Sequence, residues 1–333
     1  MQRLLATTVL AAGFFSGACS VNAQDCGTIT LALHNVQSAE LLTYVDKIIL
    51  EKGYGCSVET IPGDTVPSTT SMIEKGTPDV SSETWVDLLP EIVPQGLKDG
   101  KIVYGASALP DGGIQGWWIP KYIAEAHPEI KTVEDALAHP ELFPDPEDPS
   151  KGVIFNGSEG WGATVVTAQL FKAYDAEQKG FNLMRPGSAA GLDGAIARAY
   201  ERKVGFITYY WAPTALLGRY EMVLLEPNAA QDSVEWQRCI TNLDCPDPKV
   251  TAWPVDTVMT VVTKDFSNRV DPAIMKYFNT RGWRNTTVAS LIAWQGDNQA
   301  MGEDTAIHFL KENKDIWKEW LPADIAEKVE SGL

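Results

Sequence analysis

The sequence has few basic residues and very few histidines. It carries 27 lysines and arginines against 44 aspartates and glutamates, for a net charge of −17, and no basic cluster occurs anywhere. Because binding to phosphates requires lysines and arginines gathered on one face, no nucleic-acid partner is expected. Four histidines supply neither a convincing catalytic triad nor the close ligand spacing of a zinc site. No phosphate loop or dinucleotide fingerprint is present, so we expect no metal and no cofactor.

Long apolar runs are also missing beyond the N-terminus. Residues 1–23 indicate an export signal, in which Arg3 forms a short basic head, an apolar run follows, and "VNA" precedes Gln24. That run is too short to cross a bilayer, and no later run approaches the roughly 18 residues of a membrane helix. We predict export to the periplasm with cleavage after Ala23. A lipid anchor at Cys19 is the alternative, although the three residues before it lack the usual aliphatic side chain.

Cysteine is scarce as well, with five in the whole chain. Removal of the signal would take one and leave Cys26, Cys56, Cys239 and Cys245, an even number in an oxidising compartment. Only a short loop separates Cys239 from Cys245, which favours a disulfide between them. Cys26 and Cys56 flank one predicted strand and helix, which favours pairing between them.

About 310 mature residues exceed what one hydrophobic core usually holds, so two lobes are expected. From residue 28 the chain shows a strand, "TITLAL", a helix, "SAELLTYVDKIILEKG", and a second strand, "CSVETI". Ser38 is a plausible N-cap of this helix and Gly53 a plausible end. Similar units recur around "PDVSSETW", "GVIFNGSEGWG" and "KVGFITYYW". This alternation predicts an α/β fold with parallel sheets covered on both faces.

Tryptophan is abundant, with eleven in the chain. Trp85, Trp161 and Trp211 each end a predicted strand, and ligands of open parallel sheets bind at that edge. A single tryptophan at a strand end usually serves packing, but three in equivalent positions favour a binding site. In "GSEGWG", Gly160 and Gly162 flank Trp161 and would let the backbone approach closely the ligand for which the indole forms a wall.

An indole face attracts cations without strong hydrogen bonding, at about 0.5–2 kcal/mol per contact. A methylated ammonium group suits such a face because it has no N–H groups to satisfy. Gly162 and Ala163 begin the next predicted helix, and their N–H groups could receive an anionic group, as in a betaine. The alternative is an ordinary helix N-terminus without a ligand.

The acidic segment 143–152, "FPDPEDPSKG", is most simply a surface loop. Its carboxylates could hold calcium, but its prolines interrupt the regular ligand alternation of calcium loops.

Taken together, "NVQSAE", "ETW", "GSEGWG" and "YYWAP" make the chain resemble the periplasmic substrate-binding proteins of ABC importers for glycine betaine, proline betaine and choline. The resemblance implies a two-lobed periplasmic-binding-protein fold, each lobe a mostly parallel sheet flanked by helices, with ligand in the cleft between them. Lobe 1 would comprise residues 24–108 and 254–333, and lobe 2 residues 109–253, with crossings near "ALPDGG" and "TAWPVD". It also implies that Trp85, Trp161 and Trp211 form the box around the ammonium group.

One departure from the family concerns the ligand carboxylate. Some members place a histidine four residues after the first tryptophan, and Leu89 stands there in this chain. His34, at the end of the first predicted strand, is a candidate replacement. Trp117 or Trp118 is a candidate fourth wall, and Glu159 is a candidate for contacting a ligand hydroxyl or polarised oxygen.

The predicted function is therefore capture of a methylated ammonium ligand by a monomeric, non-catalytic protein that serves a membrane permease and its ATPase. Glycine betaine is favoured, with proline betaine, choline and trimethylamine N-oxide as further candidates. A ligand-sensing receptor is one alternative. A secreted hydrolase is another, but "NGSEG" has Asn156 where a nucleophile elbow requires glycine.

Overall fold

The computed structural model describes residues 26–333, so the predicted export signal and its cleavage site lie outside the described residues. Within this range the nine strands form one sheet in the order β2-β1-β3-β9-β4-β7-β5-β6, with β8 paired to β4. The strands are β1 (Thr28–Leu33), β2 (Ser57–Pro62), β3 (Val80–Trp85), β4 (Ile102–Pro120), β5 (Gly152–Phe155), β6 (Phe181–Met184), β7 (Ile207–Ala212), β8 (Met222–Leu224) and β9 (Asp256–Thr263).

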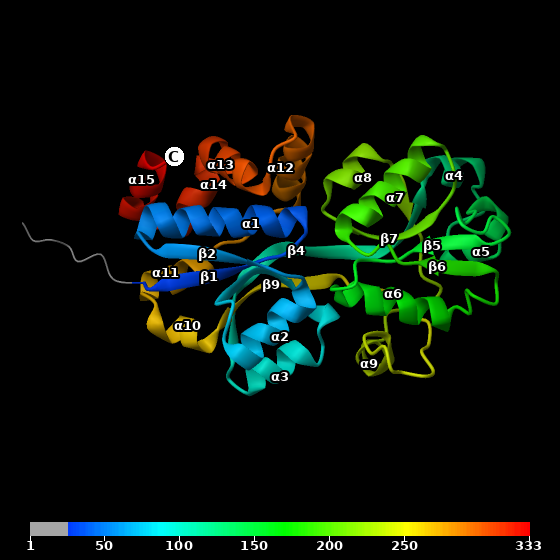
Figure 1. The fold of residues 1–333 in the computed structure, drawn as a ribbon, viewed down its shortest axis with the longest axis horizontal. Helices are drawn as coiled ribbons and strands as arrows, with labels where there is room; N and C mark the ends of the chain where they lie inside the picture. Colours follow the sequence, from blue (N-terminus) through cyan, green and yellow to red (C-terminus); the bar gives the residue numbers. More distant parts are fainter. Residues whose placement is uncertain (1–25) are drawn as a thin grey trace, which may run out of the picture.

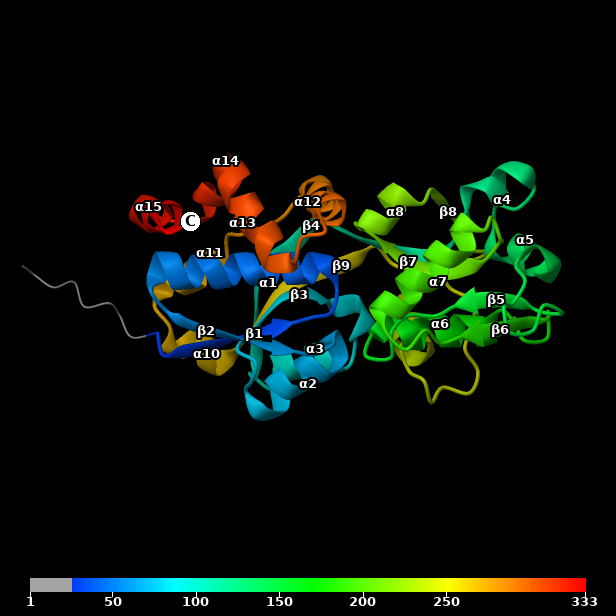
Figure 2. The ribbon, with the colours of Figure 1, turned by 45° about the horizontal axis from the view of Figure 1, so that its top comes forward.

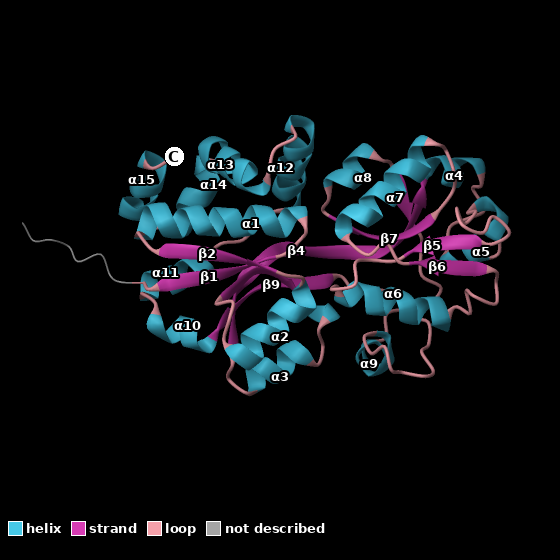
Figure 3. Ribbon diagram, in the orientation of Figure 1, coloured by secondary structure: helices cyan, strands magenta, loops and turns pink. Residues whose placement is uncertain are grey.

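Helices cover both faces of this sheet (Figures 1 and 3). They are α1 (Gln37–Ile48), α2 (Thr65–Lys75), α3 (Ile92–Lys98), α4 (Lys121–Ala126), α5 (Val133–Leu137), α6 (Gly162–Ala173), α7 (Ala189–Glu201), α8 (Ala215–Arg219), α9 (Ser233–Glu235), α10 (Lys264–Arg269), α11 (Pro272–Phe278), α12 (Asn285–Asn298), α13 (Gly302–Glu312), α14 (Lys314–Trp317) and α15 (Ala323–Ser331). The predicted α/β, two-lobed fold with a sheet flanked by helices is confirmed. The sheet is mixed rather than mostly parallel, because β1 pairs with β2 and β3, and β5 with β6 and β7, in parallel, whereas every pairing of β4 and β9 is antiparallel.

Two large hydrophobic cores divide the molecule. The first is built around β1, β3, β9, α1 and the C-terminal helices, and its largest fully buried side chains include Trp283 and Trp317. The second is built around β5, β7 and α6 and includes Phe155 and Phe206. We call the elements around these cores the first half and the second half. Figure 2 shows them as two bodies, with α12 of the first beside α8 of the second.

The first unit of the fold matches the predicted strand, helix and strand, with two local differences. β1 spans the predicted residues, and the apolar positions of α1, such as Leu41 and Val45, are completely buried. The N-cap is Val36 rather than Ser38, whose buried hydroxyl instead donates to Glu83. The helix also continues past Gly53 as a π-helix and ends at Gly55, whose φ of 75° is left-handed.

Strand β4 joins the two halves. It pairs with β9 from Ile102 to Gly113 and with β7 from Ile114 to Trp118, antiparallel in both cases. The predicted crossing at residues 108–113 is therefore part of a continuous strand. Because β4 pairs with a strand of each half, it continues the sheet from one half into the other.

Both predicted disulfides, Cys26–Cys56 and Cys239–Cys245, are present. The first joins the start of β1 to the start of β2. No helix in residues 26–333 is long and apolar enough to cross a membrane.

Candidate functional site

A cavity of about 40 Å³ lies where the two halves meet beside β4. No residue in its wall carries a charged side chain. The wall consists of Val36, Thr65, Trp85, Leu88, Leu89, Gln115, Trp161, Gly162, Ala163, Tyr209 and Trp211. The structure thus brings together five of the residues singled out from the sequence: Trp85, Trp161, Trp211 and the first two residues of α6. Trp85 and Trp211 lie at the ends of β3 and β7, as predicted, whereas Trp161 lies beyond the end of β5 and is the N-cap of α6.

The second half contributes a corner of aromatic rings. Trp161 stands almost perpendicular to Trp211, with ring centroids 5.0 Å apart and an interplanar angle of 84°. Tyr209 lies 6.0 Å from Trp211 at 22°. Tyr209 and Trp211 are two residues apart on β7 and so project from the same face of the sheet. Such a corner can present several π surfaces to one small cation.

The first half contributes Trp85, whose ring rests on the backbone of β4. A Cβ atom at Gly113 would lie only 1.9 Å from the Cζ3 atom of Trp85, so the ring occupies space that any other residue would fill. The indole N–H of Trp85 donates to Glu83 Oε1 over 2.9 Å. The ring is therefore fixed both by packing and by a hydrogen bond.

The N-terminus of α6 forms another part of the wall. The helix begins at Gly162, directly after Trp161, and no side chain caps it. The first N–H groups of an α-helix have no intrahelical acceptor, and the helix dipole makes this end electropositive. Gly162 and Ala163 can therefore offer donors to an anionic or polar ligand atom.

A polar chain that the sequence analysis missed runs from the cavity into β9. The Tyr209 hydroxyl donates to Gln115 Oε1 over 2.6 Å, and Gln115 Nε2 donates to Asp256 Oδ2. Burial raises the pKa of Asp256 to about 8, and the charge of Asp87 adds to the effect. No motif marks these residues, although Gln115 lies opposite Trp211 in the β4–β7 register. Period-two alternation from Trp211 would have indicated Tyr209.

Four further residues proposed from the sequence do not line the cavity, and one of them, Trp117, is buried in the core of the second half beside Tyr174. His34 is buried, and burial lowers the pKa of its imidazole to about 4, so it is neutral at neutral pH. Trp118 packs within the second half and donates its indole N–H to the Tyr210 carbonyl over 3.0 Å. Glu159 is exposed to solvent. Leu89, which stands where some family members have histidine, does line the cavity.

The halves also touch beside the cavity. Val66 N donates to Gly160 O over 3.3 Å, and the Trp236 indole donates to Asp87 O over 2.8 Å. A Cβ atom at Gly162 would lie 2.7 Å from the Leu88 carbonyl oxygen. We expected Gly160 and Gly162 to allow a close backbone approach, and the neighbour approached is the first half of the protein.

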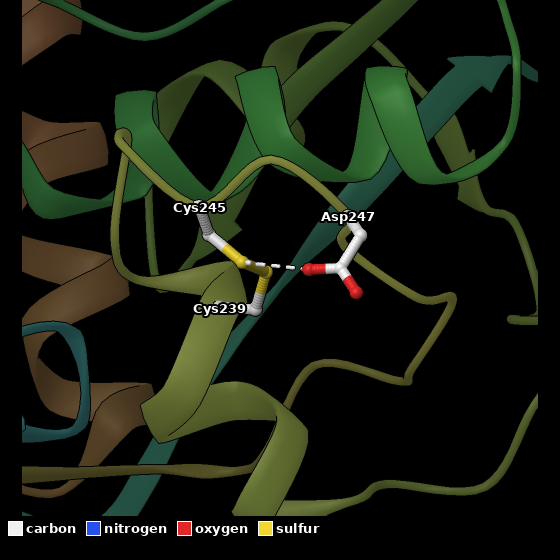
Figure 4. A group of neighbouring side chains, drawn as sticks. All are labelled: Cys239, Cys245 and Asp247. Carbon is white, nitrogen blue, oxygen red and sulfur yellow. Dashed lines mark hydrogen bonds between the residues drawn. A yellow bond between two sulfur atoms is a disulfide. The ribbon is translucent and has the colours of Figure 1, made fainter.

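Residues 26–333 contain one grouping with metal-ligand proximity, formed by Cys239, Cys245 and Asp247 (Figure 4). The two cysteines form a disulfide and have no thiolate to offer, and Asp247 accepts from Arg238 over 3.3 Å. This grouping therefore has a structural role as a disulfide crosslink.

In the acidic loop, the carboxylates are occupied by hydrogen bonds within the protein. Asp145 accepts from the Glu147 N–H and from the Asn182 side chain, each over 2.8 Å. Asp148 accepts from the Ser150 hydroxyl over 2.6 Å. These bonds account for the fold of the loop without a cation.

Solved structures with the same fold bind or are named for methylated ammonium compounds. The glycine betaine, L-proline ABC transporter binding protein ProX from Borrelia burgdorferi is 18% identical with a TM-score of 0.71, covering 91% of this chain and all of its own. An ABC-transporter choline-binding protein in complex with choline is 17% identical with a TM-score of 0.72, covering 92% and 98%. Lactococcal OpuAC in its closed form with glycine betaine is 15% identical with a TM-score of 0.67, covering 89% and 99%.

None of the curated proteins matches the sequence significantly. Residues 27–312, in contrast, match the family described as OpuAC, substrate binding domain of ABC-type glycine betaine transport system. Proteins of this family are extracellular or periplasmic, bind small ligands and function with a permease and an ATPase. With this match over most of its length, the chain belongs to the OpuAC family and is the substrate-binding protein of an ABC importer.

Proposed function

We propose that this protein captures a quaternary ammonium or methylated amine osmolyte, with glycine betaine as the favoured ligand, in a cage formed by Trp85, Trp161 and Trp211. The observation that carries the proposal is a cavity walled by indole rings from both halves and by no charged side chain. Three ring contacts at about 0.5–2 kcal/mol each would supply much of the roughly 8 kcal/mol that micromolar binding requires.

The lack of charged wall residues favours fully alkylated cations. A primary ammonium group brings three N–H donors, and burying them without acceptors is costly. A trimethylammonium group brings none. Choline, proline betaine and trimethylamine N-oxide share this headgroup chemistry and are further candidate ligands.

Glycine betaine is favoured because the cavity also offers donors for an anion. The N–H groups of Gly162 and Ala163 begin α6, and the helix dipole there attracts negative charge. We propose that they hold the carboxylate in place of the histidine that Leu89 replaces. His34 is neutral and lies outside the wall, so a direct role for it would require a movement of β1.

We further propose a monomeric, non-catalytic receptor that works in the periplasm after cleavage behind Ala23. Its lobes would comprise residues 24–108 with 254–333, and 109–253. Ligand would be enclosed when these lobes close and delivered to the permease when they open.

Calorimetric titration of the purified mature protein tests the proposal. Glycine betaine, choline, proline betaine and trimethylamine N-oxide should bind, and unmethylated glycine and ethanolamine should not compete. Trp161→Ala and Trp211→Ala should each weaken binding at least about tenfold. Trp294→Ala is the matched control, because that ring stacks on His308 outside the cavity. Equal competition by the primary amines would contradict the proposal.

A further inference from the structure

A buried carboxyl group is hydrogen-bonded to the edge of the Trp85 ring, the wall that the first half contributes. Glu83 is 2% exposed, and its Oε1 accepts two hydrogen bonds, from the Trp85 indole over 2.9 Å and from Ser38 over 3.0 Å. Its other oxygen, Oε2, has no hydrogen-bond partner within the described part of the chain. Glu83 comes two residues before Trp85 on β3, and Ser38 lies in the first turn of α1.

Few groups around Glu83 would compensate a negative charge on its carboxyl group. Arg281, the nearest cation that acts on it, is fully buried and already paired with Asp46 over 2.7 Å. His34 continues the β1–β3 register to a position beside Glu83, but its imidazole is neutral. Burial raises the pKa of Glu83, while the bonds from Trp85 and Ser38 and the charge of Arg281 oppose that rise.

A glutamine would fill the same space and accept the same two hydrogen bonds without the cost of a buried charge. A cation bound at the face of Trp85 would favour the charged form of Glu83 over the neutral form that burial favours. A carboxylate that accepts the indole N–H draws the proton toward itself and makes the ring more electron-rich. Because the medium between them has a low dielectric constant, its field also reaches a cation on the ring face.

We propose that Glu83 is a positioning residue for the cage, which fixes the plane of Trp85 and gives that wall the negative potential by which a permanent cation is preferred over a neutral group of the same shape. This inference rests on the proposed function. It adds a source of selectivity that lies outside the cavity wall, since Glu83 does not line it.

The test compares ligands that carry a cationic trimethylammonium headgroup with partners that carry a neutral tert-butyl headgroup of the same shape. Glycine betaine is paired with 3,3-dimethylbutyrate, and choline with 3,3-dimethylbutan-1-ol, in which carbon replaces the charged nitrogen. In the wild-type protein both cations should bind more tightly than their partners. Glu83→Gln should reduce this preference about tenfold by weakening the cations alone. Glu59→Gln, exposed on β2, controls for the loss of one negative charge.

Two further variants keep the test decisive. Ser38→Ala removes the second hydrogen bond but leaves the charge, so the preference should be retained. If Glu83→Gln does not fold, Glu83→Asp moves the carboxylate one methylene away from the indole, and the preference should fall a few-fold. Equal weakening of cation and neutral partner, or no change in either, would overturn the role of Glu83. A wild-type protein that binds cation and neutral partner equally would instead overturn the proposed function itself.

Discussion

Gly162→Ala tests whether the contact between the two halves controls ligand affinity. Gly162 is the first residue of α6, and its α-carbon faces Leu88 of the first half. An added Cβ would lie 2.7 Å from the Leu88 carbonyl oxygen and 2.9 Å from Leu88 Cβ, whereas ordinary contact begins at 3.4 Å. The obstacle on one side is backbone, so the halves must move apart by about 0.7 Å to accept the methyl group.

The expected loss of ligand affinity can be worked out from the contacts that this separation of the halves weakens. A gap of about 0.5–1 Å forfeits roughly a quarter to a half of each dispersion contact across it. The Val66–Gly160 hydrogen bond, already 3.3 Å long, crosses the same contact. We expect a loss on the order of 2 kcal/mol in the closed, ligand-bound form, or about 30-fold in affinity. The fold itself should not suffer, because alanine is the better helix former and Gly162 has no left-handed φ.

Calorimetry with glycine betaine would measure the affinity, and small-angle X-ray scattering would report whether ligand still compacts the molecule. Gly296→Ala is the matched control, because this helical glycine in α12 has no heavy atom within 4 Å of an added Cβ. The reasoning would be refuted if both variants bound ligand within twofold of the wild-type protein. A melting temperature that fell only in Gly162→Ala would also count against it.

Three further predictions concern buried charge and are checked by urea denaturation. Burial raises the pKa of Asp256 to about 8, whereas the same carboxyl group in the unfolded chain has a pKa near 3.8. Between these pH values the folded protein binds a proton that the unfolded chain has released. The free energy of unfolding should therefore fall as pH rises from about 3.8 to about 8. Asp256→Asn should remove this loss of unfolding free energy, which is on the order of 5 kcal/mol by pH 9 in the wild-type protein. The prediction would be refuted if the unfolding free energies of the variant and the wild-type protein changed in parallel with pH. Burial lowers the pKa of His34 to about 4, so as pH falls below 6.5 the unfolded chain takes up the proton before the folded protein does. The free energy of unfolding should therefore fall by an amount on the order of 3 kcal/mol between pH 6.5 and 4, and His34→Gln should remove this fall. If the unfolding free energy of His34→Gln fell between pH 6.5 and 4 as it does in the wild-type protein, the reasoning would be contradicted. Asp46→Asn leaves the guanidinium of Arg281 buried without its partner and should cost about 3–5 kcal/mol at pH 7, whereas a cost below about 1 kcal/mol would show that the pair is dispensable.

The sequence could predict the features that depend on local pattern. The strand at residues 28–33 and the helix start at Gly162 follow from apolar spacing and flanking residues, and both are observed. Strand topology favours a binding role for Trp85, Trp161 and Trp211 at the carboxyl ends of strands, whereas their convergence from two lobes is implied by the family resemblance. The pairing of four cysteines follows from short chain closure.

Features that depend on contacts between distant segments could not be predicted. Gln115 and Asp256 stand 141 residues apart, and only the shared strand β4 places them beside the cavity. Ser38 has the side chain of an N-cap, but a tertiary partner, Glu83, takes its hydroxyl. Trp118 is a candidate wall residue from its place in the sequence, yet its indole N–H bonds to the Tyr210 carbonyl within the second half.

Two glycines are as necessary to the proposed cage as the tryptophans, because their missing side chains leave room for one indole and for the contact between the halves. Trp85 can lean on β4 only where Gly113 leaves its ring room, and Trp161 can reach the first half only where Gly162 presents no Cβ to Leu88. Rings from separate halves can surround one headgroup only when the halves touch, so recognition and closure depend on the same contacts. A ligand too bulky for that contact would meet only the corner of Trp161 and Trp211 and would lose the wall backed by Glu83. Selectivity for a small, permanently charged headgroup then follows from how closely the two halves approach.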